Sequence, residues 1–301
     1  MVSAIRTEGL SKVFGTTVAL RSLDLQVAPG EVVGFLGPNG AGKTTTIRLL
    51  LGLIEATAGR AEIFGIDCQR HSVQAHRQLA YVPGEASLWP QLTGTQTLDL
   101  LGRVQARVDT AYRAVLIERF RLDPSKRVRA YSKGNRQKLL LVAALMSHAQ
   151  LLLLDEPTSG LDPLMEQVFR QCVREARDRG QTVFLSSHTL GEVEALCDWV
   201  AILRGGQLVE VGTLAQLRHL SALSVDVEFA GPPPDLSHMP GVVAVVSAGG
   251  RRVNCQVSGD IQPLLQVLAT AGVRHLLITE PSLEELFLAQ YGAEVKVFDG
   301  R

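Results

Sequence analysis

The chain has 301 residues, of which 46% are hydrophobic and 20% are charged, and its formal net charge at pH 7 is zero. This length and composition predict a globular protein of about two domains and exclude an intrinsically disordered chain. A zero net charge gives no support to a protein that binds nucleic acid through a strongly basic surface. The 4 cysteines form no C-x-x-C pair, so they predict reduced thiols in a cytosolic protein rather than a disulfide framework or a zinc site.

The N-terminus lacks the apolar segment of a secretory signal peptide. The leucine-rich runs of the chain are far shorter than the roughly 18 apolar residues of a membrane span. We therefore expect a protein without membrane spans, whose association with a membrane requires a partner.

The sequence up to about residue 215 alternates between short β-prone runs and longer helical patterns. Strands are expected at 2–8, 18–27, 31–36, 60–65, 79–83, 151–154, 182–186, 200–203 and 207–211. Helices are expected at 45–53, 95–120, 132–146, 162–179 and 190–197. This alternation predicts an α/β fold that binds its ligands at the carboxyl ends of the strands.

The pattern changes after about residue 215. Strands are expected at 224–229, 242–246, 252–257 and 275–278, and helices at 263–271 and 283–291. No phosphate-binding or metal-binding motif occurs in this part of the sequence. We therefore expect an α/β domain over residues 1–215 and a small α+β domain over residues 220–301.

Residues 37–45 read GPNGAGKTT and match the phosphate-binding pattern G-x-x-x-x-G-K-[ST], with an apolar strand before them and a leucine-rich helix after them. The glycines let backbone N–H groups and the helix N-terminus approach phosphate oxygens. Lys43 is placed to reach the β- and γ-phosphates, and the Thr44 hydroxyl to ligate Mg²⁺. A glycine-rich turn with a chance lysine is the alternative. We expect nucleotide contacts from Gly37, Pro38, Asn39, Gly40, Ala41, Gly42, Lys43, Thr44 and Thr45.

Two expected strands lead into polar residues. The apolar run at 151–154 is followed by Asp155 and Glu156, and the strand at 182–186 leads to His188. Asp155 is placed to hold Mg²⁺, and Glu156 to act as general base on the attacking water. His188 is placed to hydrogen-bond the γ-phosphate. Taken alone, these are an acidic turn and a solvated histidine; beside a phosphate loop, the catalytic interpretation is favoured.

A polar segment, Tyr131–Lys138, opens the helix expected at 132–146. The Ser132 hydroxyl, Gly134 and the free N–H groups at the helix start form a second candidate anion site, to which the basic side chains add charge. The alternative is an ordinary serine cap with a solvated basic face.

Taken in chain order, these motifs resemble the nucleotide-binding subunit of an ABC transporter, and the resemblance covers residues 1 to about 215. It implies a P-loop ABC cassette with a helical subdomain at about 87–147. Gly37–Thr45 looks like Walker A, Asp155–Glu156 like the end of Walker B with the catalytic glutamate, and His188 like the switch histidine.

The resemblance assigns three further places. The segment Ser159–Asp162 looks like the D-loop, which adds Asp162 to the nucleotide-binding residues. The segment at Tyr131–Lys138 looks like the family signature, usually written LSGGQ, in which Ser132 and Gly134 face phosphate. Phe14 lies where the family stacks an aromatic residue on adenine; the alternative is a core aromatic residue.

Two departures from the family pattern bear on function. The signature has Tyr131, Lys133 and Asn135 in place of leucine, glycine and glutamine, and Lys133 is expected to add positive charge near the γ-phosphate. The loop that usually carries a glutamine has Gly84 at that place, which has no side chain to ligate Mg²⁺ or to position water. We expect the adjacent Glu85 to take over part of this role as a metal ligand.

The resemblance implies an ATPase that binds ATP and Mg²⁺ and pairs with a second, identical subunit, so that the signature of one closes over the nucleotide of the other. It also implies a separate transmembrane permease and a location on the cytoplasmic face of the cell membrane. Apolar residues at 88–94 are expected to receive a permease helix, with local packing as the alternative. Relatives with a C-terminal segment like Pro281–Phe287 are typically paired with permeases that export drugs, antibiotics or polymers.

The sequence leaves three alternatives to this interpretation. ATPases of this type that act on nucleic acid or ribosomes usually carry two cassettes or a long coiled-coil insertion, neither of which the sequence shows, so no nucleic-acid partner is expected. A non-catalytic regulatory cassette is disfavoured by the intact Lys43, Asp155, Glu156 and His188. An importer ATPase would differ in its C-terminal domain and would have a neighbouring binding protein.

Overall fold

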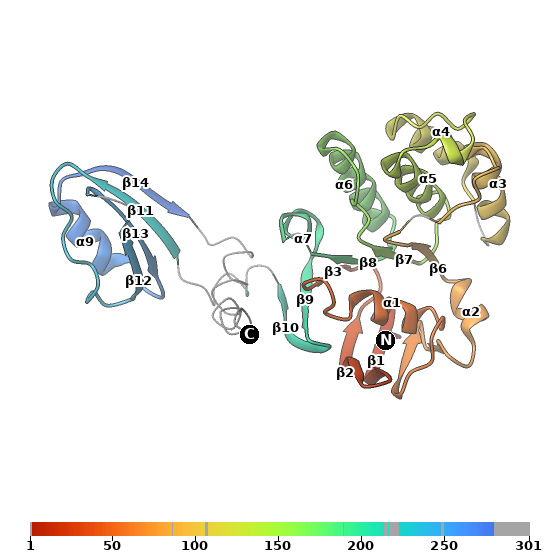
Figure 1. The fold of residues 1–301 in the computed structure, drawn as a ribbon, viewed down its shortest axis with the longest axis horizontal. Helices are drawn as coiled ribbons and strands as arrows, with labels where there is room; N and C mark the ends of the chain where they lie inside the picture. The colour runs from red at the N-terminus through yellow and green to blue at the C-terminus, as the bar shows by residue number, and fades with distance from the viewer. Residues whose placement is uncertain are drawn as a thin grey trace. The chain divides into compact units, whose positions relative to one another are not determined.

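The computed structural model describes residues 2–85, 87–105, 108–188, 190–213, 216, 223–247 and 250–279. The chain divides into two compact units, Met1–Gly212 and Thr213–Arg301 (Figure 1). Each unit has its own sheet structure and its own hydrophobic core, and each is described by itself.

A six-stranded sheet forms the centre of the first unit, with the strand order β10-β9-β3-β8-β7-β6. The strands are β3 Val32–Leu36, β6 Leu79–Val82, β7 Leu151–Asp155, β8 Thr182–Ser187, β9 Trp199–Arg204 and β10 Gln207–Thr213. The pairs from β6 through β7, β8 and β3 to β9 are all parallel. Every residue of β3, β7 and β8 is buried, which explains their continuous apolar sequences.

A four-stranded antiparallel sheet, in the order β2-β1-β4-β5, completes the first unit's β structure. Its strands are β1 Ile5–Phe14, β2 Thr17–Val27, β4 Ala58–Ile63 and β5 Ile66–Asp67. Helix α1, Lys43–Leu50, lies between the two sheets and contacts β2, β4 and β7 (Figure 1). Its Ile47 and Leu50 are fully buried in a core built from both sheets. The helix that follows the phosphate loop is therefore fixed from two sides.

The opposite face of the six-stranded sheet is covered by helices (Figure 1). They are α5 Lys133–Leu145, α6 Pro163–Asp178 and α7 Leu190–Leu196. Helix α5 packs on β6, α6 on β8, and α7 on β3 and β8, while α3 Gly94–Val104 and α4 Thr110–Arg119 pack on α5. Among the residues that the structure describes, no helix combines the length and apolarity that crossing a membrane requires.

Several elements differ from the sequence expectation. The single helix expected at 95–120 is wrong, because Thr93 and Asp109 each start a helix of their own. Thr93 forms a capping box with Gln96, and the Asp109 carboxylate accepts the Tyr112 N–H, so the break is encoded by local capping.

Two further differences lie near the N-terminus of the first unit. The first strand runs on to Phe14 instead of ending at residue 8, with register shifts where it pairs with β2. Helix α2, Ser72–His76, has no counterpart among the expected elements. It is about one turn long, which is too short for a helical period to show in the sequence.

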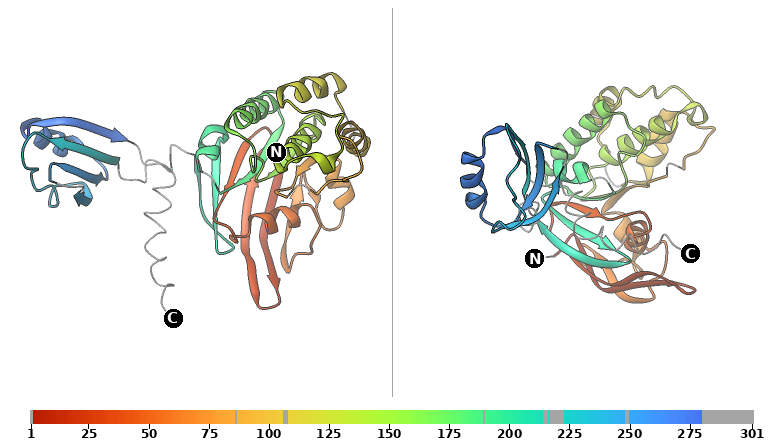
Figure 2. Two further views of the ribbon diagram at one scale, coloured as in Figure 1. Left: turned by 45° about the horizontal axis from the view of Figure 1, so that its top comes forward. Right: turned by 60° about the vertical axis from the view of Figure 1, so that its left-hand side comes forward.

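In the second unit, the described residues form a four-stranded antiparallel sheet on which a helix packs. The strands are β11 Leu223–Phe229, β12 Val242–Ser247, β13 Arg252–Val257 and β14 Val273–Thr279, in the order β12-β13-β11-β14. Helix α9, Gln262–Thr270, packs on one face of this sheet (Figure 2) and buries Leu264 and Leu268 in its core. The helix expected at 283–291, with the segment Pro281–Phe287, lies outside the described residues.

Candidate functional site

The phosphate loop joins β3 to α1 and lines a pocket together with Ala19 and Glu156. Two of its glycines are required by close packing. A Cβ at Gly37 would lie 2.3 Å from the carbonyl oxygen of Leu203, and a Cβ at Gly42, whose φ is 109°, would lie 2.6 Å from that of Ala19. The loop can therefore rest directly on β9 and β2 only with glycine at both positions. The pocket is lined from within the loop by Pro38, Asn39, Gly40, Ala41, Gly42, Lys43, Thr44 and Thr45.

Lys43 places a buried cation inside this loop. Its Nζ donates hydrogen bonds to the Gly37 carbonyl at 2.6 Å and to the Pro38 carbonyl at 3.2 Å, and the side chain is 5% exposed. Burial lowers the pKa of Lys43, while the negative charges of Glu156 and Asp155 act in the opposite direction. A positive charge held in this way is ready to pair with a phosphate oxygen.

The two acids at the end of β7 are held in different ways. Asp155 is buried, and its Oδ1 accepts a 2.5 Å hydrogen bond from the Ser186 hydroxyl of the neighbouring strand β8. Glu156 has a left-handed backbone, with φ of 47°, and its N–H donates to the Ser186 carbonyl at 3.1 Å. This turn takes Glu156 out of the strand, so that it lines the phosphate-loop pocket while Asp155 remains at the strand end.

One carboxylate oxygen of Glu156 faces both other candidate catalytic groups. Glu156 Oε1 lies 3.8 Å from Lys43 Nζ and 3.3 Å from His188 Nδ1. The His188 side chain is about half exposed, whereas Lys43 is buried. The structure thus brings together Glu156, Lys43 and His188, which come from three separate segments that follow the carboxyl ends of β7, β3 and β8. A carboxylate in this position can accept a proton from water beside a phosphate.

The residues proposed to hold Mg²⁺ line an adjoining pocket of about 450 Å³, which includes Thr44, Gly84, Glu85 and Asp155. The described residues contain no group of three or more His, Cys, Asp or Glu that could hold a metal by themselves. That fits Mg²⁺, which binds through one or two carboxylates and completes its shell with phosphate oxygens and water. The Asp155 carboxylate and the Thr44 hydroxyl are suited to hold it.

Gly84 lies against Asp155, at the place where a side chain would begin beside the metal pocket. A Cβ on Gly84 would lie 3.3 Å from the Asp155 carbonyl oxygen and 3.7 Å from its carboxyl carbon. Glycine leaves this space open, and the pocket wall continues with the exposed Glu85. A longer side chain at this position would therefore start beside Asp155, and glycine leaves this part of the pocket open.

The signature segment starts α5 and contacts a loop of its own chain. Ser132 caps the helix by accepting the Asn135 N–H at 3.2 Å. A Cβ at Gly134 would lie 2.4 Å from the Gly160 carbonyl oxygen, and Lys133 Nζ donates to the Ser159 hydroxyl at 3.1 Å. Neither Ser132 nor Gly134 lines the phosphate-loop pocket of this chain. The Lys133 ammonium, expected near a γ-phosphate, is bonded to the D-loop in this structure.

Two residues around the signature make contacts that the sequence does not predict. The Tyr131 hydroxyl donates to the Asp123 carbonyl at 2.6 Å, and burial raises the pKa of Tyr131. The buried Gln137 donates from Nε2 to the Pro157 carbonyl at 3.0 Å, just after Glu156. Gln137 interrupts an apolar helix face, which is the sequence signal that could have identified it.

The remaining site candidates do not line these two pockets. Phe14 lies near the turn of the β1–β2 hairpin and is 47% exposed, so it is not a core residue. The Lys12 ammonium lies 4.9 Å from the centre of its ring. Asp162 caps α6 by accepting the Met165 N–H at 3.0 Å.

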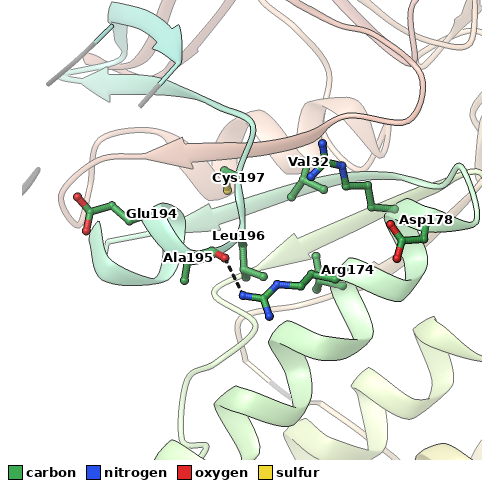
Figure 3. Close-up of a pocket in the computed structure, with 9 residues that line it drawn as sticks. Val32, Arg174, Asp178, Glu194, Ala195, Leu196 and Cys197 are labelled. Carbon is green, nitrogen blue, oxygen red and sulfur yellow. Dashed lines mark hydrogen bonds between the residues drawn. The ribbon is translucent and has the colours of Figure 1, made fainter. Parts of the chain in front are cut away.

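A third pocket lies between α6 and α7 (Figure 3) and is lined by Val32, Arg174, Asp178 and Glu194, among others. Its position at Val32, where β3 begins, differs from that of the phosphate loop, which follows the other end of the strand. The Arg174 guanidinium donates to the Ala195 carbonyl at 3.4 Å, which closes one side of the pocket (Figure 3). We therefore place the functional site at the phosphate loop.

Comparison with known proteins agrees with this geometry. The family model for ABC transporters matches residues 20–159. The Nod factor export ATP-binding protein I of Rhizobium etli is 32% identical over 98% of this chain and 95% of its own length. The daunorubicin resistance ATP-binding protein DrrA3 of Streptomyces coeruleorubidus is 34% identical over 98% of both chains.

Solved structures give the same result for the first unit. The structure of an ATP-binding subunit of an ABC transporter is 31% identical, covers 72% of this chain and 93% of its own, and superposes with a TM-score of 0.68. A dimeric ATP-binding cassette bound to ADP and Pi has a TM-score of 0.63 at 21% identity, over 70% of this chain and 98% of its own, and shows the same fold. The chain belongs to the family of ABC transporter ATP-binding proteins, the ATPase subunits of these transporters.

Proposed function

We propose that this ATPase powers a separate transmembrane permease, at the cytoplasmic face of the cell membrane, and that the transport is export. The similarity to the Nod factor export and daunorubicin resistance proteins covers 98% of the chain, so it includes the second unit as well as the cassette. Because the similarity extends over both units of this chain, a role in export fits the whole sequence and not only the cassette.

The observation that carries the proposal is the separation of the two nucleotide-binding parts within one chain. The phosphate loop opens on a pocket that Glu156 lines, whereas Ser132 and Gly134 lie at the start of α5 against the D-loop. A nucleotide on the loop would be closed over by the signature of a second subunit. We propose that two identical chains hold two ATP molecules in this way, with no nucleic acid involved.

The chain's own residues have separate tasks in ATP hydrolysis under this proposal. The loop N–H groups and Lys43 hold the phosphates, and Glu156 accepts the proton of the attacking water. His188, 3.3 Å from Glu156, orients that carboxylate and contacts the transferred phosphate. Mg²⁺, held by Thr44 and Asp155, would neutralise charge on the phosphate oxygens. Phe14 would stack on adenine.

We propose that the segment 88–94, which follows Gly84 in the chain, contacts the permease. In this segment Trp89 is 49% exposed, whereas Leu88 and Leu92 are partly buried, so the exposed anchor is the tryptophan rather than the leucines. Aromatic residues of this kind are the usual anchors of an interface.

We expect co-expression with a candidate permease to give a complex that survives gentle detergent extraction, because the ATPase binds the permease directly. Trp89→Ala is expected to weaken this complex about tenfold or more in affinity, since a buried aromatic anchor contributes strongly to binding. Val73→Ala, at an exposed residue of α2, is the matched control and should leave the complex intact. Recovery of the chain with ribosomes or nucleic acid, and not with a membrane protein, would contradict the proposal.

We propose that Glu85 supplies part of the metal contact that Gly84 lacks, because it lines the same pocket as Asp155 and Thr44. Glu85→Ala is expected to raise the Mg²⁺ concentration for half-maximal ATP turnover about threefold to tenfold, since one carboxylate is lost from the metal shell. The measurement is a Mg²⁺ titration of ATP turnover, with Glu85→Gln to separate charge from size. Unchanged rate and Mg²⁺ dependence in both variants would refute this role.

A further inference from the structure

Glu192 is a partly buried carboxylate that the proposed mechanism does not use. It lies in α7, and its Oε2 accepts a 2.7 Å hydrogen bond from the Ser187 hydroxyl. Its other oxygen, Oε1, is buried and has no hydrogen-bond partner in the described part of the chain. A partly buried acid with one buried, unpaired oxygen is unfavourable for folding alone, because an apolar residue would fill the same space without desolvating a charge.

The Ser187 hydroxyl that Glu192 binds belongs to one of the two segments that carry the candidate catalytic groups. Ser187 ends β8 and directly precedes His188, and Thr158 follows Glu156 by two residues. Burial raises the pKa of Glu192, and the charge of Glu166 on α6 acts in the same direction. The hydroxyls of Ser187 and Thr158 and the imidazole of His188 act in the opposite direction.

The backbone already joins these two segments one residue earlier. The Glu156 N–H donates to the Ser186 carbonyl at 3.1 Å, and the Ser186 hydroxyl donates to Asp155 at 2.5 Å. Beyond this point the strands end, and His188 and Thr158 continue into separate loops. From α7, Glu192 holds the Ser187 hydroxyl directly before the loop that carries His188.

We propose that Glu192 is a positioning residue, which fixes Ser187 at the end of β8 and so keeps His188 beside Glu156. The proposal rests on the roles proposed above for Glu156 and His188. Under this proposal, Glu192 does not contact the nucleotide itself. It acts through Ser187 on the placement of His188, whose Nδ1 lies 3.3 Å from Glu156 Oε1.

The test compares Glu192→Ala and Glu192→Gln in the full chain. Glu192→Ala is expected to lower kcat for ATP about tenfold, because a displaced catalytic group loses rate steeply, while the KM for ATP and the thermal midpoint stay close to wild type. Glu192→Gln keeps an oxygen that accepts from Ser187 and is expected to restore kcat to within about twofold of wild type. Glu194→Gln, two residues along the same helix, is the matched control and should not change kcat.

Two further measurements separate positioning from folding. Ser187→Ala is expected to lower kcat as much as Glu192→Ala does, because each variant removes the same Ser187–Glu192 hydrogen bond. The double variant should for this reason lower kcat no further. Additive losses, a wild-type kcat in Glu192→Ala, or a fall in kcat matched by equal losses of nucleotide binding and stability would overturn the proposal. If Glu192→Ala does not fold, Ser187→Ala decides, and an unchanged kcat there would refute it. A wild-type rate of ATP hydrolysis for Glu156→Gln would instead refute the proposed role of Glu156, on which the proposal for Glu192 rests.

Discussion

Glu156→Gln is expected to slow ATP turnover by about 10²- to 10⁴-fold while ATP still binds, because an amide cannot accept the proton of the attacking water. The variant keeps the size of the side chain in the phosphate-loop pocket, so the loop and its glycines should stay in place. Lys43, at 3.8 Å, loses one of the two negative charges that raise its pKa, so the pKa of Lys43 should fall further.

The decisive measurements for Glu156→Gln are single-turnover hydrolysis and the binding of a fluorescent ATP analogue to the same preparation. Slow hydrolysis with intact binding should also trap an ATP-bound dimer that elutes earlier on size exclusion. Glu118→Gln serves as the control, because it makes the same change at an exposed carboxylate of α4 that lines neither pocket of the site. Hydrolysis at the wild-type rate would show that another group is the base, and a loss of ATP binding would show that Glu156 holds the loop.

The parts of the site that the sequence predicts best are those where one short segment determines its own geometry. The segment Gly37–Thr45 predicts a phosphate loop because its glycines, lysine and threonine stand at fixed spacing between a strand and a helix. The apolar run at 151–154 predicts a buried parallel strand, and Asp155 and Glu156 then necessarily lie at its carboxyl end. Local chemistry of this kind can be read from spacing alone.

Contacts between distant segments could not be predicted from spacing. The bond from Ser186 to Asp155 and the two contacts of Glu156 Oε1 arise because β8, β7 and β3 are neighbours in the sheet. Sheet order is decided by the packing of the whole unit and not by any one motif. The same applies to Gln137, whose partner Pro157 follows the next strand.

Capping residues account for the largest error in the helical region. The run at 95–120 has apolar residues at helical spacing throughout, so its period predicts one helix. Asp109 nevertheless starts a second helix by accepting the Tyr112 N–H, and Thr93 starts the first. Both are capping residue types, and weighting them above the hydrophobic period would have divided the helix correctly.

The contact between the signature and the D-loop leads to a second large effect, for Gly134→Ala. A Cβ at this position would lie 2.4 Å from the Gly160 carbonyl oxygen, which belongs to the backbone and cannot rotate away. We expect the variant to lose about 1–3 kcal/mol of unfolding free energy, as overpacked sites do. Displacing the start of α5 by about 1 Å should also lower ATP turnover about 100-fold, because the signature would no longer fit over the partner's nucleotide.

Gly191→Ala is the matched control, because it is also the second residue of a helix but has no atom within 4 Å of the added Cβ. Alanine stabilises a helix relative to glycine, so Gly191→Ala should not lose stability. Gly134→Ala would also keep its stability if its Cβ did not clash with Gly160, so a loss of stability in that variant reports the clash. Thermal unfolding without nucleotide isolates the contact with Gly160, because no partner subunit is then closed over the site. If Gly134→Ala is as stable as wild type but turns over ATP slowly, Gly134 acts only at the partner's phosphate. If Gly134→Ala loses stability without nucleotide, the D-loop of the same chain holds the signature in place before ATP brings two subunits together.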